Sequence, residues 1–223
     1  MTPVFPLSQA HLPGDNVVLR VFEPRYRALF AELEESRDTS FVTVLIERGS
    51  EVGGGDRRFG LGVKVHLEST ESTDGMLLVH GRADEPVRVT SWLEDDPYPR
   101  AEVEMVEYPE PPGAVLSDAA SALTLLGQSV RSLLARHGVD AGHGPSHLLA
   151  PLQTVASGRW YSGTPGMSAV QHAFWAVARC VPCGPLDRHQ FLRPGELLER
   201  IRGVRRVIEH TDEVLRFGSG RDS

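Results

Sequence analysis

The hydrophobic and polar positions in the first half of the chain follow the pattern of β-strands. Short runs of β-branched and aromatic residues recur there, and glycine, proline or acidic clusters separate them. These runs predict strands over residues 17–22, 41–47, 60–67, 76–81, 87–92 and 101–106. One helix is expected among them, over residues 24–35, because its apolar residues recur at helical spacing from Tyr26 to Leu33. Short strands with one early helix favour a small β-barrel or half-barrel.

The second half shows helical periodicity instead. Apolar residues line one side of the segments 117–137, 146–156 and 168–181, and most clearly the last one, from Leu197 to Leu215. Between the halves, the proline cluster at residues 108–113 cannot continue a strand or a helix. We therefore predict an α+β chain with a β-rich subdomain at residues 1–113 and a helical subdomain at residues 114–223.

Lysine is nearly absent: of 23 basic residues, only Lys64 is a lysine. Lysine supplies the phosphate-binding cation of Walker-type loops, the amine of Schiff bases and the base of serine–lysine dyads. Lys64 alternates with Val63 and Val65, which is typical of a half-buried strand with its polar face in solvent. The sequence also has no nucleophile elbow, metalloprotease helix or dinucleotide fingerprint. We find no positive evidence for an enzyme and predict no cofactor.

The two cysteines, Cys180 and Cys183, are too few for a disulfide framework and indicate a reducing, cytoplasmic environment. Their two-residue gap is also found in zinc sites, but a structural zinc needs about four ligands and no second close pair accompanies them. We favour free cysteines at the end of an apolar helix and predict no metal. The chain has no signal-peptide pattern and no run of the ~18 apolar residues that a membrane span requires.

Charge divides unevenly between the halves. Residues 1–113 hold 11 Lys+Arg against 21 Asp+Glu, and residues 114–223 hold 12 against 9, so the balances are −10 and +3 and the net charge is −7. This charge argues against a generic nucleic-acid or anionic-membrane binder, which needs clustered cations. RNA binding through Arg202, Arg205 and Arg206 in the last helix is kept as an alternative. No pattern indicates an oligomeric state.

Three motifs stand at the beginning of the chain: Phe5-Pro6-Leu7, Leu12-Pro13-Gly14, and Val-Phe-Glu-Pro-Arg-Tyr-Arg-Ala-Leu at residues 21–29. Together they resemble the opening of the N-terminal, substrate-binding domain of Lon proteases. The resemblance is strongest at residues 5–29 and continues more weakly over nearly the whole chain, although a later family motif lacks its aromatic residue here. It implies a PUA-like β-barrel followed by a helical bundle. It also implies the binding of polypeptide substrates or of a protein partner.

The signature residues of this resemblance have a physical role of their own. Phe22 is expected to anchor the strand end in the core, and Glu23 lies near the positive end of the helix dipole. Pro24 fixes the first helical turn, Arg25 can pair with an acid, and Tyr26 begins the buried stripe. We therefore predict a structural role for these five residues rather than direct substrate contact.

The resemblance also bears on catalysis and on nucleic acid. Full-length Lon proteases join this domain to an ATPase module and a serine–lysine protease module, and neither lysine can be supplied here, because Lys64 lies in the β-rich half. The resemblance therefore implies a stand-alone, non-catalytic protein. PUA-like relatives include RNA binders, but the balance of −10 over residues 1–113 argues against that activity.

A candidate partner site is suggested by a glycine-rich loop that carries Arg159, Trp160 and Tyr161. Trp, Tyr and Arg are favoured anchors at interfaces. Together with Trp92 and Tyr98, they are expected to line a groove at the barrel–helix junction. The alternative is that Trp160 folds back and fills that junction. A small-molecule sensor or an unrecognised enzyme using the same cleft is a further alternative to polypeptide binding.

Overall fold

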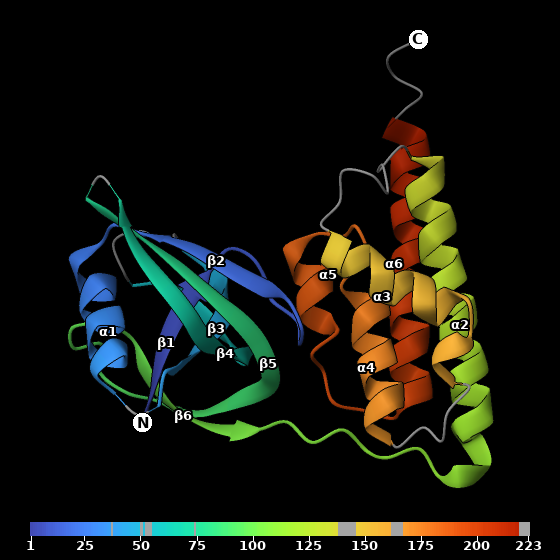
Figure 1. Ribbon diagram of the computed structural model, residues 1–223, viewed down its shortest axis with the longest axis horizontal. Coiled ribbons are helices and arrows are strands. Elements are labelled where there is room, and N and C mark those ends of the chain that lie inside the picture. The colour runs from blue at the N-terminus through green and yellow to red at the C-terminus, as the bar shows by residue number, and fades with distance from the viewer. Residues whose placement is uncertain are drawn as a thin grey trace. The chain divides into compact units, whose positions relative to one another are not determined.

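The computed structural model describes residues 1–36, 38–49, 51, 55–73, 75–137, 146–161 and 167–218 of the chain (Figure 1). The chain divides into two compact units, which we call the β unit (Met1–Val106) and the helical unit (Glu107–Ser223). Strands occur in the first and long helices dominate the second, so the predicted α+β class is confirmed. The domain boundary predicted between residues 113 and 114 stays a prediction.

The described part of the β unit contains one sheet of six strands. They are β1 (Thr2–Leu7), β2 (Asn16–Val21), β3 (Ser40–Arg48), β4 (Arg57–Thr73), β5 (Met76–Trp92) and β6 (Arg100–Met105). The strand order is β2-β5-β4-β3-β1-β6, and β5 also pairs with β6. The sheet therefore closes on itself, and β2 is attached outside the closed cycle. The length of β5 allows this, because its residues 77–82 pair with β2 and its residues 87–92 pair with β6.

Three strands differ from the sequence-based expectation, and one of them is β4, which covers Arg57–Thr73 where residues 60–67 were expected. β1 was not among the predicted strands, yet it pairs in parallel with β3 through residues 4–7 and with β6 through Thr2 and Pro3. The predicted strands at 76–81 and 87–92 are one continuous strand, β5. The register between β4 and β5 shifts twice, which lets the pairing continue past Pro86.

The helix α1 (Pro24–Glu35) has the bounds that its apolar spacing predicts. Its proline occupies the first turn, where a missing N–H costs nothing. Its buried face packs on the sheet: the Phe30 ring lies edge-on to Phe41 of β3, with the ring centroids 5.2 Å apart. Burial of this apolar stripe anchors the helix next to β1, whose Phe5 ring centroid lies 6.0 Å from that of Phe30.

The described helices of the helical unit are α2 (Gly113–Arg136), α3 (Ser146–Ala156), η1 (Arg159–Tyr161), α4 (Met167–Ala178), α5 (Pro185–Gln190) and α6 (Leu197–Gly218). α2 packs against α3, α4 and α6. The amphipathic pattern predicted for the last helix is confirmed, since Leu197, Ile201, Val204 and Ile208 are all buried. No helix among the described residues is long and apolar enough to cross a membrane.

A buried arginine lies inside the helical unit. Arg200 of α6 is 8% exposed, and its guanidinium carbon lies 3.9 Å from the ring centre of Tyr108, 4.0 Å from Phe174 and 4.7 Å from Trp175. Its Nη1 donates to the side-chain oxygen of Gln171 over 2.9 Å. Its Nε and Nη2 are buried and have no hydrogen-bond partner among the described residues. Burial lowers the pKa of Arg200 to about 10.

Candidate functional site: a cleft between β1 and β2

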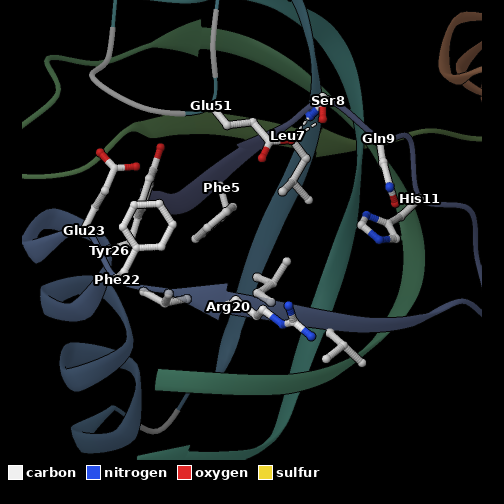
Figure 2. Close-up of a pocket in the computed structure, with 13 residues that line it drawn as sticks. Phe5, Leu7, Ser8, Gln9, His11, Arg20, Phe22, Glu23, Tyr26 and Glu51 are labelled. Carbon is white, nitrogen blue, oxygen red and sulfur yellow. Dashed lines mark hydrogen bonds between the residues drawn. The ribbon is translucent and has the colours of Figure 1, made fainter. Parts of the chain in front are cut away.

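A pocket of about 520 Å³ lies in the β unit, lined by residues of β1, the segment after it, β2 and the start of α1 (Figure 2). Its volume is in the range of ordinary ligand pockets. Figure 2 shows Phe22, Glu23 and Tyr26 toward one end of the pocket, Gln9 and His11 toward the other, and Phe5 between them. The first end therefore combines two aromatic rings with a carboxylate, and the second end is polar.

The strand β2, whose residues alternate between the core and the solvent, forms one wall of this cleft. Val17, Leu19 and Val21 point into the core, and the residues between them are exposed. One of those outward residues is apolar: Val18 is 55% exposed. Phe22, which follows the strand, is 57% exposed. Two large apolar side chains thus stand in solvent beside a pocket, and such an arrangement is typical of a binding surface.

Two aromatic rings that pack against each other at a tilt form a floor of the pocket. The ring centroids of Phe5 and Tyr26 lie 4.2 Å apart, with an interplanar angle of 32°. Both side chains are buried. Burial raises the pKa of Tyr26 to about 12, and the nearby Arg25 guanidinium only partly opposes this effect. Tyr26 therefore stays a neutral phenol at physiological pH.

The raised pKa of Tyr26 predicts a loss of stability in alkali. The phenol of the unfolded chain ionises near pH 10, whereas the folded one holds its proton to about pH 12. Its contribution is therefore complete below pH 10 and is lost as the pH rises from 10 to 12, with a slope of up to ~1.4 kcal/mol per pH unit. We expect Tyr26→Phe to flatten this slope in urea unfolding at pH 9, 10 and 11. Parallel pH profiles for the two proteins would contradict the prediction.

The carboxylates of the cleft are engaged by neighbouring groups. Arg25 Nε donates to Glu23 Oε2 over 3.1 Å, and the Arg25 guanidinium carbon lies 4.4 Å from the centre of the Tyr26 ring. The Glu51 carboxylate accepts hydrogen bonds from the backbone N–H and the hydroxyl of Ser8, drawn as dashed lines in Figure 2. These contacts fix both side chains, and the Arg25 guanidinium compensates the charge of Glu23.

The basic side chain of the cleft has a different environment. Arg20 is an outward, exposed residue of β2 that lines the pocket. No ion pair of Arg20 is found among the described residues of the chain. Arg20 therefore presents a positive charge at the β2 side of the cleft, although the β-rich half as a whole is acidic.

The residues predicted to form a partner site fall in both units. Trp92 ends β5, is 38% exposed and lies under the Arg58 guanidinium, whose carbon is 5.2 Å from the ring centre. Tyr98 is only 1% exposed and donates a hydrogen bond to the Glu32 carboxylate, so its ring is a core residue of the β unit. Neither of them lines the cleft.

The remaining three candidates belong to the helical unit. Arg159 and Trp160 lie in the single turn of η1, with the Arg159 side chain exposed and Trp160 half-buried. Tyr161 ends this turn, and its side chain and the loop after it lie outside the described residues. The expectation that Arg159, Trp160 and Tyr161 line one groove together with Trp92 and Tyr98 stays a prediction.

The family signature lies at the cleft. Arg25 pairs with Glu23 and Tyr26 is buried, as predicted. The expectation that Phe22 anchors the strand end in the core is wrong, because its ring is largely exposed; the inward positions of β2 end at Val21. Phe22, Glu23 and Tyr26 all line the pocket. The sequence did carry one signal of this binding surface: Val18 is an apolar residue at a position of the alternating strand that faces solvent.

The cysteine pair follows α4. Cys180 and Cys183 are both free thiols, and burial raises the pKa of Cys183 to about 11. Among the described residues, no group of three or more His, Cys, Asp or Glu side chains is arranged to hold a metal ion.

A closed sheet with a preformed surface cleft, followed in the chain by a bundle of helices, defines a two-unit α+β domain. The chain belongs to the family of the ATP-dependent protease La (LON) substrate-binding domain, whose model matches residues 1–209. A search among curated proteins found no match.

Solved structures of similar fold include two Lon domains. The Lon N-terminal domain protein from Xanthomonas campestris matches with a TM-score of 0.58 and 21% identity, over 90% of this chain and 94% of that one. The N-terminal domain of the Mycobacterium avium complex Lon protease matches with a TM-score of 0.62 and 15% identity, over 93% and 97% of the respective chains. At these identities the likeness concerns the fold.

Proposed function

We propose that the protein is a non-catalytic binding module that takes a segment of another polypeptide in the cleft between β1 and β2. The observation that carries this proposal is the pair of exposed apolar side chains, Val18 and Phe22, beside a pocket with an aromatic floor. Burial of such side chains by a ligand is favourable, at about 25 cal/mol per Å² of apolar surface. The family description, a substrate-binding domain of a protease, supports a polypeptide as the ligand.

Both carboxylates of the cleft are held in fixed positions, Glu23 by Arg25 and Glu51 by Ser8. Such fixed polar groups suit a preformed binding surface. The cytoplasmic location inferred from the cysteine content is part of this proposal.

Replacing Phe22 by alanine should weaken polypeptide binding at least ~10-fold, because burial of a phenylalanine side chain contributes about 1.5–3 kcal/mol. The stability of the fold should change little, since the ring is 57% exposed in the free protein. The probe is a fluorescently labelled α-lactalbumin that has been reduced and alkylated and is therefore unfolded. Its affinity is measured by fluorescence anisotropy.

A matched control and a rival site complete this experiment. Met105→Ala removes an apolar side chain that is 61% exposed but does not line the cleft, and we expect it to leave the affinity unchanged. If Trp160→Ala weakens binding and Phe22→Ala does not, the cleft is not the site. If the unsubstituted protein does not bind the unfolded probe, or if single-stranded RNA displaces it, the proposed function is wrong.

A further inference from the structure

The edge of β2 that faces away from β5 is open toward the cleft. Among the described residues, β2 pairs with β5 alone and stands at one end of the strand order. In an antiparallel pair, alternate residues of an edge strand direct their N–H and C=O groups away from the partner strand. Half of the backbone groups of β2 are therefore directed toward the side on which the pocket lies (Figure 2).

The opposite wall of the cleft is a strand that is also only partly paired. β1 pairs with β3 along residues 4–7, but it pairs with β6 only at Thr2 and Pro3. β6 in turn pairs with residues 87–92 of β5, whereas β2 pairs with residues 77–82 of the same strand. Among the described residues, β2 and β1 therefore do not pair with each other. The pocket lies in this interruption of the sheet, between the two strands.

We propose that the bound polypeptide segment enters this interruption as an extended strand that pairs with the open edge of β2. This inference rests on the proposed function and specifies how the ligand is held. Backbone hydrogen bonds to β2 supply affinity that depends little on sequence. Alternate side chains of the segment then point toward the floor formed by Phe5 and Tyr26, and the others point to solvent.

The charge of the cleft sets the composition of the segment. Glu23 and Glu51 are engaged by Arg25 and Ser8, whereas no acid pairs with Arg20 within the described ranges. Arg20 lies on the open strand itself and lines the pocket. The preferred ligand is therefore an extended segment with alternating apolar residues and an acidic side chain opposite Arg20.

The test uses a nine-residue peptide that alternates phenylalanine and threonine, with one threonine replaced by glutamate and both ends blocked. Two further versions carry N-methyl groups, one on the odd-numbered amides and the other on the even-numbered amides. A strand directs alternate N–H groups to opposite sides, so only one set faces β2. We expect one methylated version to bind at least ~10-fold more weakly and the other to stay within ~3-fold of the parent.

Amide hydrogen exchange provides a second readout that needs no substitution. The parent peptide should slow exchange at alternate amides of β2 (Asn16–Val21) and leave the strands away from the cleft unchanged. Arg20→Glu should weaken binding of the glutamate peptide by roughly threefold and strengthen binding of the corresponding lysine peptide. Equal affinities of Arg20→Glu for the two peptides would overturn the charge preference.

The outcomes separate the inference from the proposed function. If the parent peptide binds and Phe22→Ala weakens it, but the two methylated versions bind equally and no β2 amide is protected, strand addition is wrong and the proposed function stands. If neither the parent peptide nor the unfolded α-lactalbumin binds, both are wrong.

Discussion

Replacing Gly62 by alanine should destabilise the β unit by at least ~3 kcal/mol, the upper end of the cost of overpacking a core. Gly62 lies in β4 between two strands, opposite Val44 of β3 and Val87 of β5. A Cβ at this position would lie 2.3 Å from the carbonyl oxygen of Thr43 and 2.8 Å from Cγ1 of Val44. The carbonyl belongs to the neighbouring backbone, so relief requires opening of the β3–β4 pairing.

Gly60 gives the matched control for this prediction. It lies in the same strand, two residues away, and a Cβ there would meet nothing within 4 Å. Gly60→Ala should therefore stay within ~1 kcal/mol of the unsubstituted protein. The free energies of unfolding are measured by urea denaturation monitored by circular dichroism. Similar stabilities of Gly62→Ala and Gly60→Ala would show that the sheet accommodates the methyl group at Gly62.

Replacing Arg200 by glutamate should destabilise the helical unit by ~4 kcal/mol or more. The guanidinium lies against the faces of Tyr108, Phe174 and Trp175, where the partial negative charge of the rings attracts a cation. A carboxylate at the same place would be repelled by these faces and would be buried without a counterion. Thermal unfolding followed by far-UV circular dichroism at pH 7 measures the loss of helix.

Arg200→Met is the informative partner of this substitution. The arginine is stabilised by its ring contacts and by one hydrogen bond to Gln171. Its Nε and Nη2, however, are buried without hydrogen-bond partners among the described residues. Burial also disfavours its charged form, which lowers its pKa. An unbranched apolar side chain removes both the attraction and this cost, so we expect a change within ~1 kcal/mol. If Arg200→Met destabilises as strongly as Arg200→Glu, the stabilising effect of the cation–ring contacts outweighs desolvation.

Elements with clear periodicity could be predicted from the sequence, and elements that depend on distant partners could not. α1 and α6 have repeated apolar positions that directly define their buried faces. β1 was missed because Pro3 and Pro6 remove two backbone donors, which normally argues against a strand. β3 and β6 nevertheless pair with it, a fact that local residues do not reveal.

The candidate site was harder to predict than the fold. Aromatic and arginine residues in a glycine-rich loop pointed to Trp160, but the cleft depends on where β2 ends relative to its inward positions. Phe22 follows Val21, the last inward residue, and its own side chain is therefore exposed. The hydrophobicity of Phe22 alone suggested a core position. The direction of a side chain at a strand end depends on the turn that follows, here the turn into α1, and hydrophobicity does not reveal it. The PUA-like classification and the role of Trp160 and Tyr161 stay predictions.

The pairing of β1 with β6 has a consequence for synthesis of the protein on the ribosome. Thr2 lies opposite Ala101 and Pro3 opposite Arg100, so the first strand of the β unit is joined by its last strand. Until that strand has emerged, the apolar residues Val4 and Phe5 belong to a nascent chain that cannot close its sheet. Contacts of such long sequence separation slow folding. A β unit whose β6 has not yet been made therefore exposes an incomplete sheet, which is open to chaperones and to aggregation.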